Sequence, residues 1–170
     1  WGYDFNHATA PTKEYVDQVN RYWLETYNID GFRFDFTKGF ANTTANYSVE
    51  RINNIKRMSD SIWAVDPDQY IILEHWCDNN EEEQLADYGC MLWGNVTHGY
   101  QNSGKGFPAN SSLTNGIYTN RTWSQPHLIS YMESHDEERL MYESITFGNA
   151  SNPAHNAKDP YTALGRMQGL

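Results

Sequence analysis

Three carboxylic acids stand where a catalytic site could be built. Asp35, Glu74 and Asp136 each lie at the end of a segment whose pattern predicts a β-strand. If the strands that end at Asp35 and Glu74 are neighbours, about 4.8 Å apart, their carboxyl groups can lie about 5 to 5.5 Å apart. This separation suits retaining glycoside hydrolysis, in which one carboxylate attacks the anomeric carbon and the other acid protonates the departing oxygen. Asp136, with His135 beside it, is then predicted to hold sugar hydroxyls and to stabilise the oxocarbenium-like transition state.

The neighbours of the first two acids predict different roles for them. Arg33 precedes Asp35 by two residues and so shares its face of an alternating strand, where the positive charge favours the ionised carboxylate. A barrel strand covered by helices on its other face would bury this pair and desolvate Asp35. Taken alone, the pair fits a structural salt bridge on an edge strand equally well. Glu74 follows the apolar run 71–73, which would raise its pKa, so we predict Asp35 as nucleophile and Glu74 as general acid/base.

Helical and strand patterns alternate along the chain that must position these acids. The central strand places phenylalanines 32, 34 and 36 on one face and the ionic pair on the other. The elements predicted in order are a helix over 12–28, a strand over 31–36, a helix over 52–63, a strand over 70–75, a short acidic helix over 81–87, a strand over 90–93, an excursion over 94–124, a strand run over 128–136 and a helix from Asp159. The excursion is either a functional loop or an inserted small element.

This order predicts an α/β protein with a parallel sheet. Nucleotide-binding folds lack their glycine-rich signatures here, because no GxGxxG follows a strand and no GxxxxGK[ST] occurs. Ionisable residues recur instead at the carboxyl ends of strands, which is how a (β/α)8 barrel builds its active site.

Composition narrows the class of partner. The 170 residues carry a formal net charge of −10, which argues against nucleic acid because phosphates require a basic face. Aromatic residues form 15% of the chain and suit a neutral ligand with flat faces, such as a sugar ring, although most of them must be core. No segment approaches the roughly 20 apolar residues of a membrane span. The chain starts at Trp1 and stops inside a predicted helix, so we interpret it as a piece of a longer protein, cut at both ends.

Residues near the acids receive plainer interpretations. Trp76, just after Glu74, is the best candidate for stacking on a sugar, and His75 is predicted to be a structural or rim histidine. The acidic run 81–83 is predicted to be a solvated helix start, favoured there by the helix dipole. Core packing is predicted for the other candidates, Tyr88, Trp93 and Trp123. Cysteines 77 and 90 have no metal-ligand spacing and are predicted to be ordinary buried thiols, with a disulfide left open.

Three of these motifs together resemble a known family. The segment 31–35 (GFRFD), the strand end at Glu74 and the pair His135-Asp136 resemble, in order and spacing, the second, third and fourth signature regions of the α-amylase family of glycoside hydrolases, family 13. The amino-acid sequences of the flanking segments 36–40 and 133–139 look closest to those of secreted α-amylases of gut-type bacteria. The resemblance implies a partial (β/α)8 TIM barrel, roughly strands 4 to 7 with their helices, acting on the α-1,4-glucosidic bonds of starch, glycogen or maltooligosaccharides.

The resemblance also implies residue roles. Arg33 would support the nucleophile Asp35, while Glu74 would be the acid/base. His135 and Asp136 would bind the sugar at the cleavage subsite. The position of Lys38 looks like the family's lysine at the first acceptor subsites. Many α-amylases carry a histidine next to that lysine, and this chain has a glycine there.

One signature region is missing. The family's first region contributes an aspartate and a histidine near the end of strand 3, and segment 4–7 (DFNH) resembles it only superficially, so we interpret it as a loop. Because the family's common calcium ligand comes partly from that region, the resemblance leaves calcium open and no metal ligand is assigned. The resemblance also implies that the protein is secreted, periplasmic or on the cell surface. Four strands cannot close an eight-stranded barrel, so we expect the chain alone to be inactive and poorly soluble.

Three alternatives remain beside hydrolysis. An α-glucan transglycosylase, such as a glucanotransferase or branching enzyme, would share all three carboxylates and differ in how well water reaches the glycosyl-enzyme. A non-catalytic glucan-binding relative would be expected to lose Asp35 or Glu74, and both are present. A metal-dependent lyase on the same barrel would need a divalent cation and would form no covalent sugar intermediate.

Overall fold

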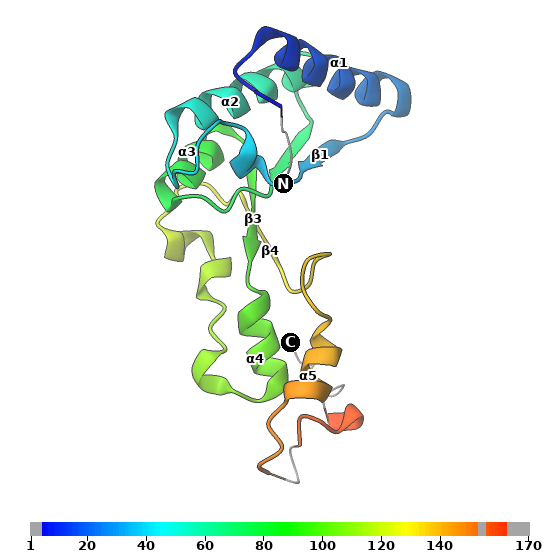
Figure 1. Cartoon of the computed structure of the whole chain (residues 1–170), viewed down its shortest axis with the longest axis vertical. Coiled ribbons are helices and arrows are strands. Elements are labelled where there is room, and N and C mark those ends of the chain that lie inside the picture. The colour runs from blue at the N-terminus through cyan, green and yellow to red at the C-terminus, as the bar shows by residue number, and fades with distance from the viewer. Residues whose placement is uncertain (1–4, 153–155, 163–170) are drawn as a thin grey trace. The chain divides into compact units, whose positions relative to one another are not determined.

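The structure, a computed structural model, describes residues 5–152 and 156–162 (Figure 1). Four short strands form one sheet in the order β1 (Gly31–Phe34), β2 (Tyr70–Leu73), β3 (Met91–Asn95) and β4 (Leu128–Tyr131). The pairings of β1 with β2 and of β2 with β3 are parallel. The register places Phe34 opposite Leu73, so the next residues, Asp35 and Glu74, emerge at the same edge of the sheet. A mixed α/β fold with a parallel sheet is therefore confirmed.

The described chain contains five α-helices, of which the first precedes β1. They are α1 (Ala10–Tyr27), α2 (Val49–Trp63), α3 (Asn79–Tyr88), α4 (Thr97–Lys105) and α5 (Leu140–Phe147). Polar caps fix the starts of α2 and α3: Ser48 Oγ accepts a hydrogen bond from the Arg51 amide, and the Asp78 carboxylate accepts one from the Asn80 amide. Helix α3 stops at Gly89, whose φ of 117° is one that glycine adopts without steric cost. None of the helices in the described ranges is long and apolar enough to cross a membrane.

The chain divides into two compact units, residues up to 93 with 121–129, and residues 94–120 with those from 130 onward. The core of the first unit comes from one face of α2, from α3, from β2 and from the start of β3. Its most deeply buried apolar side chains are Ile55, Ile62, Ile71, Leu73, Leu85 and Leu92. Each such side chain stabilises the fold by about 1.5 to 3 kcal/mol relative to an exposed one. Helix α1 packs against α2, and the Arg57 guanidinium lies 2.7 Å from the Asp17 carboxylate between them.

The second unit is built around α4 and α5, which pack against each other. Leu140 is fully buried, and Lys105 Nζ lies 2.8 Å from Glu143 Oε2. The amide of Leu140 donates to the carboxylate of Glu133, which satisfies an N–H group at the start of α5. These contacts join the segment after β3 to the segment after β4 within this unit.

Several predicted boundaries were wrong. The central strand ends at Phe34, and Phe36 turns away with φ 42°, so it does not continue the aromatic face. The strand run 128–136 ends at Tyr131, and α5 was not predicted. The segment 94–124, interpreted as either a functional loop or an inserted small element, contains α4. The helix predicted from Asp159 lies mostly outside the described residues, as does Asp4 of the loop 4–7.

Candidate active site

Asp35 and Glu74 follow neighbouring parallel strands and share one arginine. The Arg33 guanidinium forms an ion pair with Asp35 through Nη1, and its Nη2 lies 3.1 Å from Glu74 Oε1. The predicted neighbourhood of the two acids is therefore present, with the arginine bridging them. A planar guanidinium can face two carboxylates at once, which a lysine ammonium does less well.

Arg33 itself rests on an aromatic ring that the sequence did not single out for this purpose. The guanidinium carbon lies 4.0 Å from the centroid of the Trp93 indole, on the next strand but one. This distance is typical of a cation–π interaction. The alternation along β3 could have suggested that Trp93 faces the same side as the acids, but only the strand order brings it under Arg33.

Glu74 is buried, with 2% of its side chain exposed. Its Oε2 accepts a hydrogen bond of 2.9 Å from the Phe36 amide. Burial raises the pKa of Glu74 above its ordinary value; the Phe36 amide and the Arg33 charge oppose this shift, while neighbouring Asp35 adds to it. The predicted rise in the pKa of Glu74 is therefore confirmed in direction, and a raised pKa is what a general acid needs near neutral pH.

Asp35 does not have the predicted buried environment. Its side chain is 67% exposed, although it keeps its ion pair with Arg33. The reason is the position of β1 at the end of the strand order, where residues 5–152 and 156–162 supply a partner strand on one side only. The asymmetry between the acids therefore comes from the burial of Glu74 rather than from desolvation of Asp35.

Two residues just after the acids have a left-handed backbone. Phe36 follows Asp35 directly with φ 42°, and Trp76 follows Glu74 by two residues with φ 49°. Such values are rare for residues with a Cβ and are held by the surrounding structure, most often at functional sites. Trp76 is 38% exposed, so its ring is accessible, and sugar stacking on it stays a prediction.

The remaining predicted binding residues lie in two places. Lys38 is in a short 3-10 helix, η1 (Thr37–Gly39), and its Nζ donates a 2.9 Å hydrogen bond to Asn46 Oδ1. His135 and Asp136 belong to the second unit, where His135 Nε2 lies 3.6 Å from Asp136 Oδ1 and both side chains are about half exposed. A shared site with Asp35 and Glu74 stays a prediction for this pair.

The acidic run 81–83 is not the solvated helix start that was predicted. Glu81 is fully buried and Glu82 is 4% exposed. Each carboxylate pairs with an arginine far away in the sequence, Glu81 with Arg51 and Glu82 with Arg121. Burial alone would raise the pKa of Glu81, but hydrogen bonds from His75, Arg51 and the Ser48 amide lower it below its ordinary value. The partners lie 30 or more positions away in the sequence, so local pattern could not reveal them.

A cluster of three possible metal ligands lies near the acids, but one of the three already has a charged partner. Ligand atoms of His75, Cys77 and Glu81 lie within 4.8 Å of one another. The Glu81 carboxylate, however, already binds the buried Arg51 guanidinium through both of its oxygens. Burial raises the pKa of Cys77 to about 12. His75 is confirmed as a structural histidine, 1% exposed.

Both cysteines are free thiols, so the disulfide that was left open is absent. Cys90 is buried beside the Ser59 hydroxyl, and burial raises its pKa to about 11. Trp123 is confirmed as core, 3% exposed, whereas Tyr88 is 37% exposed and its hydroxyl donates to Asp60.

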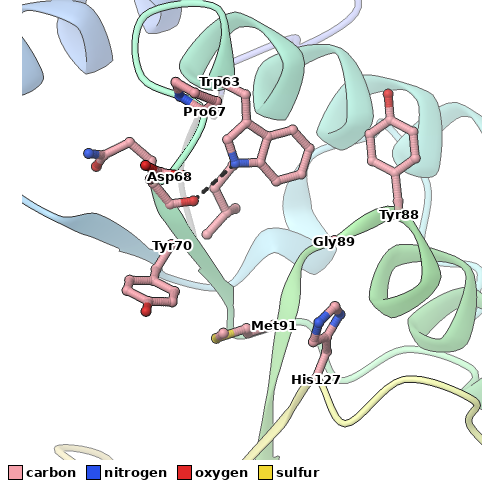
Figure 2. Close-up of a pocket in the computed structure, with 10 residues that line it drawn as sticks. Trp63, Pro67, Asp68, Tyr70, Tyr88, Gly89, Met91 and His127 are labelled. Atoms are coloured by element: carbon pink, nitrogen blue, oxygen red, sulfur yellow. Dashed lines mark hydrogen bonds between the residues drawn. The ribbon is translucent and has the colours of Figure 1, made fainter.

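A separate hollow of about 400 Å³ opens at the amino ends of β2 and β3, the ends opposite Asp35 and Glu74 (Figure 2). Figure 2 shows the Trp63 indole beside it, donating to a backbone carbonyl, with Tyr70, Met91 and His127 around the opening. Its residues contribute nothing to the paired acids.

No protein-family model matches the chain, and no curated protein matches it either. The geometry of the paired acids therefore carries the functional interpretation.

Proposed function

We propose that this chain carries the paired acids of a retaining glycoside hydrolase that cleaves α-1,4-glucosidic bonds of starch, glycogen or maltooligosaccharides. The observation that carries the proposal is the placement of Asp35 and Glu74 at the ends of adjacent parallel strands, joined by Arg33, with only Glu74 buried. The resemblance to the α-amylase family supplies the substrate class. A (β/α)8 barrel completed by further strands is part of the same proposal.

The first step would form a covalent glycosyl-enzyme. An oxygen of the Asp35 carboxylate attacks the anomeric carbon while the bond from that carbon to the bridging oxygen breaks. The Glu74 carboxylic acid gives its proton to the bridging oxygen, so the leaving chain departs as a neutral alcohol. Asp35 ends as an ester and Glu74 as a carboxylate.

The second step would return both acids to their starting states. Once Asp35 is esterified, its negative charge no longer raises the pKa of Glu74. Glu74 is then better suited to act as a base, taking a proton from water as the water oxygen attacks the anomeric carbon. The ester bond breaks, Asp35 regains its charge, and Glu74 regains its proton. The sugar is released with its original anomeric configuration.

The other predicted residues have supporting roles in this proposal. Trp76 would stack on a sugar ring, and Lys38 would contact the sugar on the leaving-group side. His135 and Asp136 would bind hydroxyls of the sugar whose bond is cleaved.

The test compares the full-length protein with Asp35→Ala and Glu74→Ala on soluble starch and on a maltooligosaccharide. New reducing ends are expected from the wild type and a loss of at least about 10³-fold in both variants. Asp68→Asn is the matched control, because Asp68 is an exposed acid beside the distant hollow and should leave the rate unchanged.

Rescue by azide separates the two roles. With an activated α-glycoside, Asp35→Ala and azide should give a glycosyl azide of inverted configuration, because azide replaces the nucleophile. Glu74→Ala and azide should give the retained configuration, because azide then attacks the glycosyl-enzyme. Redistributed chain lengths without new reducing ends would assign the protein to the transglycosylases instead. Unaltered substrate with all proteins would leave a glucan-binding relative.

A further inference from the structure

Four buried polar side chains form a continuous chain behind the strand ends, which we call the anchoring network: Thr37, His75, Glu81 and Arg51. All four are at most 1% exposed. Thr37 Oγ1 lies 2.9 Å from His75 Nδ1, and His75 Nε2 lies 2.9 Å from Glu81 Oε1. Arg51 binds both oxygens of Glu81, at 2.6 and 2.9 Å. The network therefore runs from α2 and α3 to the turn after β1.

The far end of the network is itself held firmly. Glu81 also accepts a 2.6 Å hydrogen bond from the Ser48 amide, at the start of α2. Arg51 donates further hydrogen bonds to the carbonyl oxygens of Lys38, Ala45 and Asn46. A charged pair this deeply buried persists only with its hydrogen bonds satisfied, so it has little freedom to move. His75 must carry a proton on Nε2, since an ionised Glu81 can only accept.

At the other end of the network, Thr37 contacts the backbone of Glu74. The Thr37 amide and the Thr37 hydroxyl both lie within hydrogen-bond distance of the Glu74 carbonyl oxygen, at 2.8 and 3.0 Å. The hydroxyl has one proton, which it donates either to that carbonyl oxygen or to His75 Nδ1, and the Thr37 amide holds the carbonyl in both cases. Thr37 is thus tied to the strand end that carries the acid and lies against His75, which contacts the buried ion pair. The preceding residue, Phe36, has the left-handed backbone described above, which requires such restraint.

We propose that Thr37 is a positioning residue for the general acid: it holds the turn after β1 so that the Phe36 amide stays against Glu74 Oε2. This inference rests on the proposed function of Glu74. The amide of Phe36 lies 2.9 Å from Oε2. Arg33 Nη2 lies 3.1 Å from the other oxygen, Oε1, and the Asp35 side chain is also within hydrogen-bonding reach of the Glu74 carboxyl.

The charged groups that face the Glu74 carboxyl in the described structure are Arg33 and Asp35, both from the β1 segment. The hydrogen bonds and charges at that carboxyl come from Phe36, Arg33 and Asp35, none of which belongs to the anchoring network. Removing the Thr37 hydroxyl should therefore act on Glu74 only through the turn that carries the Phe36 amide. Because this amide lowers the pKa of Glu74, loosening the turn should raise that pKa further.

The test uses Thr37→Val in the full-length protein, since valine keeps the shape and lacks the hydroxyl. Two readouts are followed: the pH profile of kcat/KM on a maltooligosaccharide, and the 13C titration of the Glu74 carboxyl. The basic limb of the profile, where the acid loses its proton, should move to higher pH. The NMR midpoint should move in the same direction. At the optimum, kcat should fall about tenfold or more with KM unchanged, because buried Thr37 contacts no substrate.

Two further variants guard against a simple folding defect. Thr37→Ser restores the hydroxyl and should return both readouts to wild-type values. Thr37→Cys keeps a weak donor and should move both readouts upward by less than valine does.

The outcomes separate this inference from the proposed function. An active wild type whose Thr37→Val and Thr37→Cys variants keep the wild-type limb and NMR midpoint would overturn the positioning role. An inactive wild type would overturn the proposed function, and the NMR titration would still decide whether Thr37 governs the Glu74 carboxyl. A fall in kcat with neither readout shifted would show a merely structural role and would also overturn the inference.

Discussion

Arg33 serves two carboxylates that need opposite protonation states. Its ion pair with Asp35 favours a charged nucleophile, and its approach to Glu74 favours the charged form there too. Burial of Glu74 outweighs the arginine, so the pKa of Glu74 still lies above its ordinary value. One cation can therefore support both acids because their burial differs so widely, with side-chain exposures of 67% and 2%.

Replacing Arg33 by lysine should expose this dependence. Lysine keeps the charge but offers a single point of contact, so it cannot face both acids and lie flat on the Trp93 indole. We expect kcat/KM on a maltooligosaccharide to fall about 10- to 100-fold, as for loss of one charge-assisted contact in an active site. Arg21→Lys is the control, because its ion pair with Glu25 on α1 is exposed. Equal rates for the Arg33 variant and the wild type would contradict the bridging role.

At the residue scale, the sequence predicted the groups whose partners lie on the same strand. Arg33 and Asp35 are two positions apart, so alternation alone places them together. The Phe36 amide, the Thr37 hydroxyl and the Trp93 ring were missed, since their contacts depend on strand register and on a left-handed turn. The burial of Glu81 was also missed, because its partner Arg51 is on another helix and is 30 positions away in the sequence.

The spacing of the two acids is set one level higher, by the pairing of β1 with β2. At the start of this pair, Gly31 lies opposite Tyr70. A Cβ on Gly31 would lie 2.5 Å from the Tyr70 carbonyl oxygen and 2.7 Å from Tyr70 Cβ, so the strands could not keep their present approach. The glycine thus permits the close pairing that brings Asp35 and Glu74 out side by side.

Gly31→Ala should therefore weaken both stability and activity. We expect the free energy of unfolding to fall by about 1 to 3 kcal/mol, the usual cost of overpacking, as measured by urea titration. Activity should fall as well, because the strand ends would move apart. Gly39→Ala is the matched control: its Cβ would meet only the Phe36 ring, at 3.6 Å, which is ordinary contact. If Gly31→Ala left the free energy of unfolding and the activity unchanged, the close approach of β1 and β2 at this position would not be needed.

Elements with strong periodicity could be predicted, and those made by tertiary contacts could not. Helix α2 has an apolar face of regular helical spacing, and β2 is a short apolar run, so both were expected. Helix α4 is mostly polar and contains two glycines, so no period marks it. Its packing against α5 and the ion pair of Lys105 with Glu143 stabilise it instead.

For the molecule as a whole, the alternation of helices and strands was enough to predict the α/β class. It was not enough to predict the division into two units, because that division follows from which segments contact each other. Nor was it enough to predict the exposed side chain of Asp35. This side chain follows β1, which is at the end of the strand order and has one unpaired side in the described part of the chain. In the proposed barrel, a further strand would pair with this side of β1.

The raised pKa values of Cys77 and Cys90 should make both thiols react slowly with labelling reagents in the folded chain. Only thiolates react with maleimides or disulfide reagents, and pKa values of about 12 for Cys77 and about 11 for Cys90 keep both protonated at neutral pH. We expect almost no labelling of the folded protein in an hour at pH 7 and two labels per chain in urea, counted by mass spectrometry. Rapid labelling of the folded protein would contradict these burial effects. Cysteines introduced beside Asp35 and beside Asp136 could then carry a pair of spin labels, and a short distance between them would place the three acids around a single glycosidic bond.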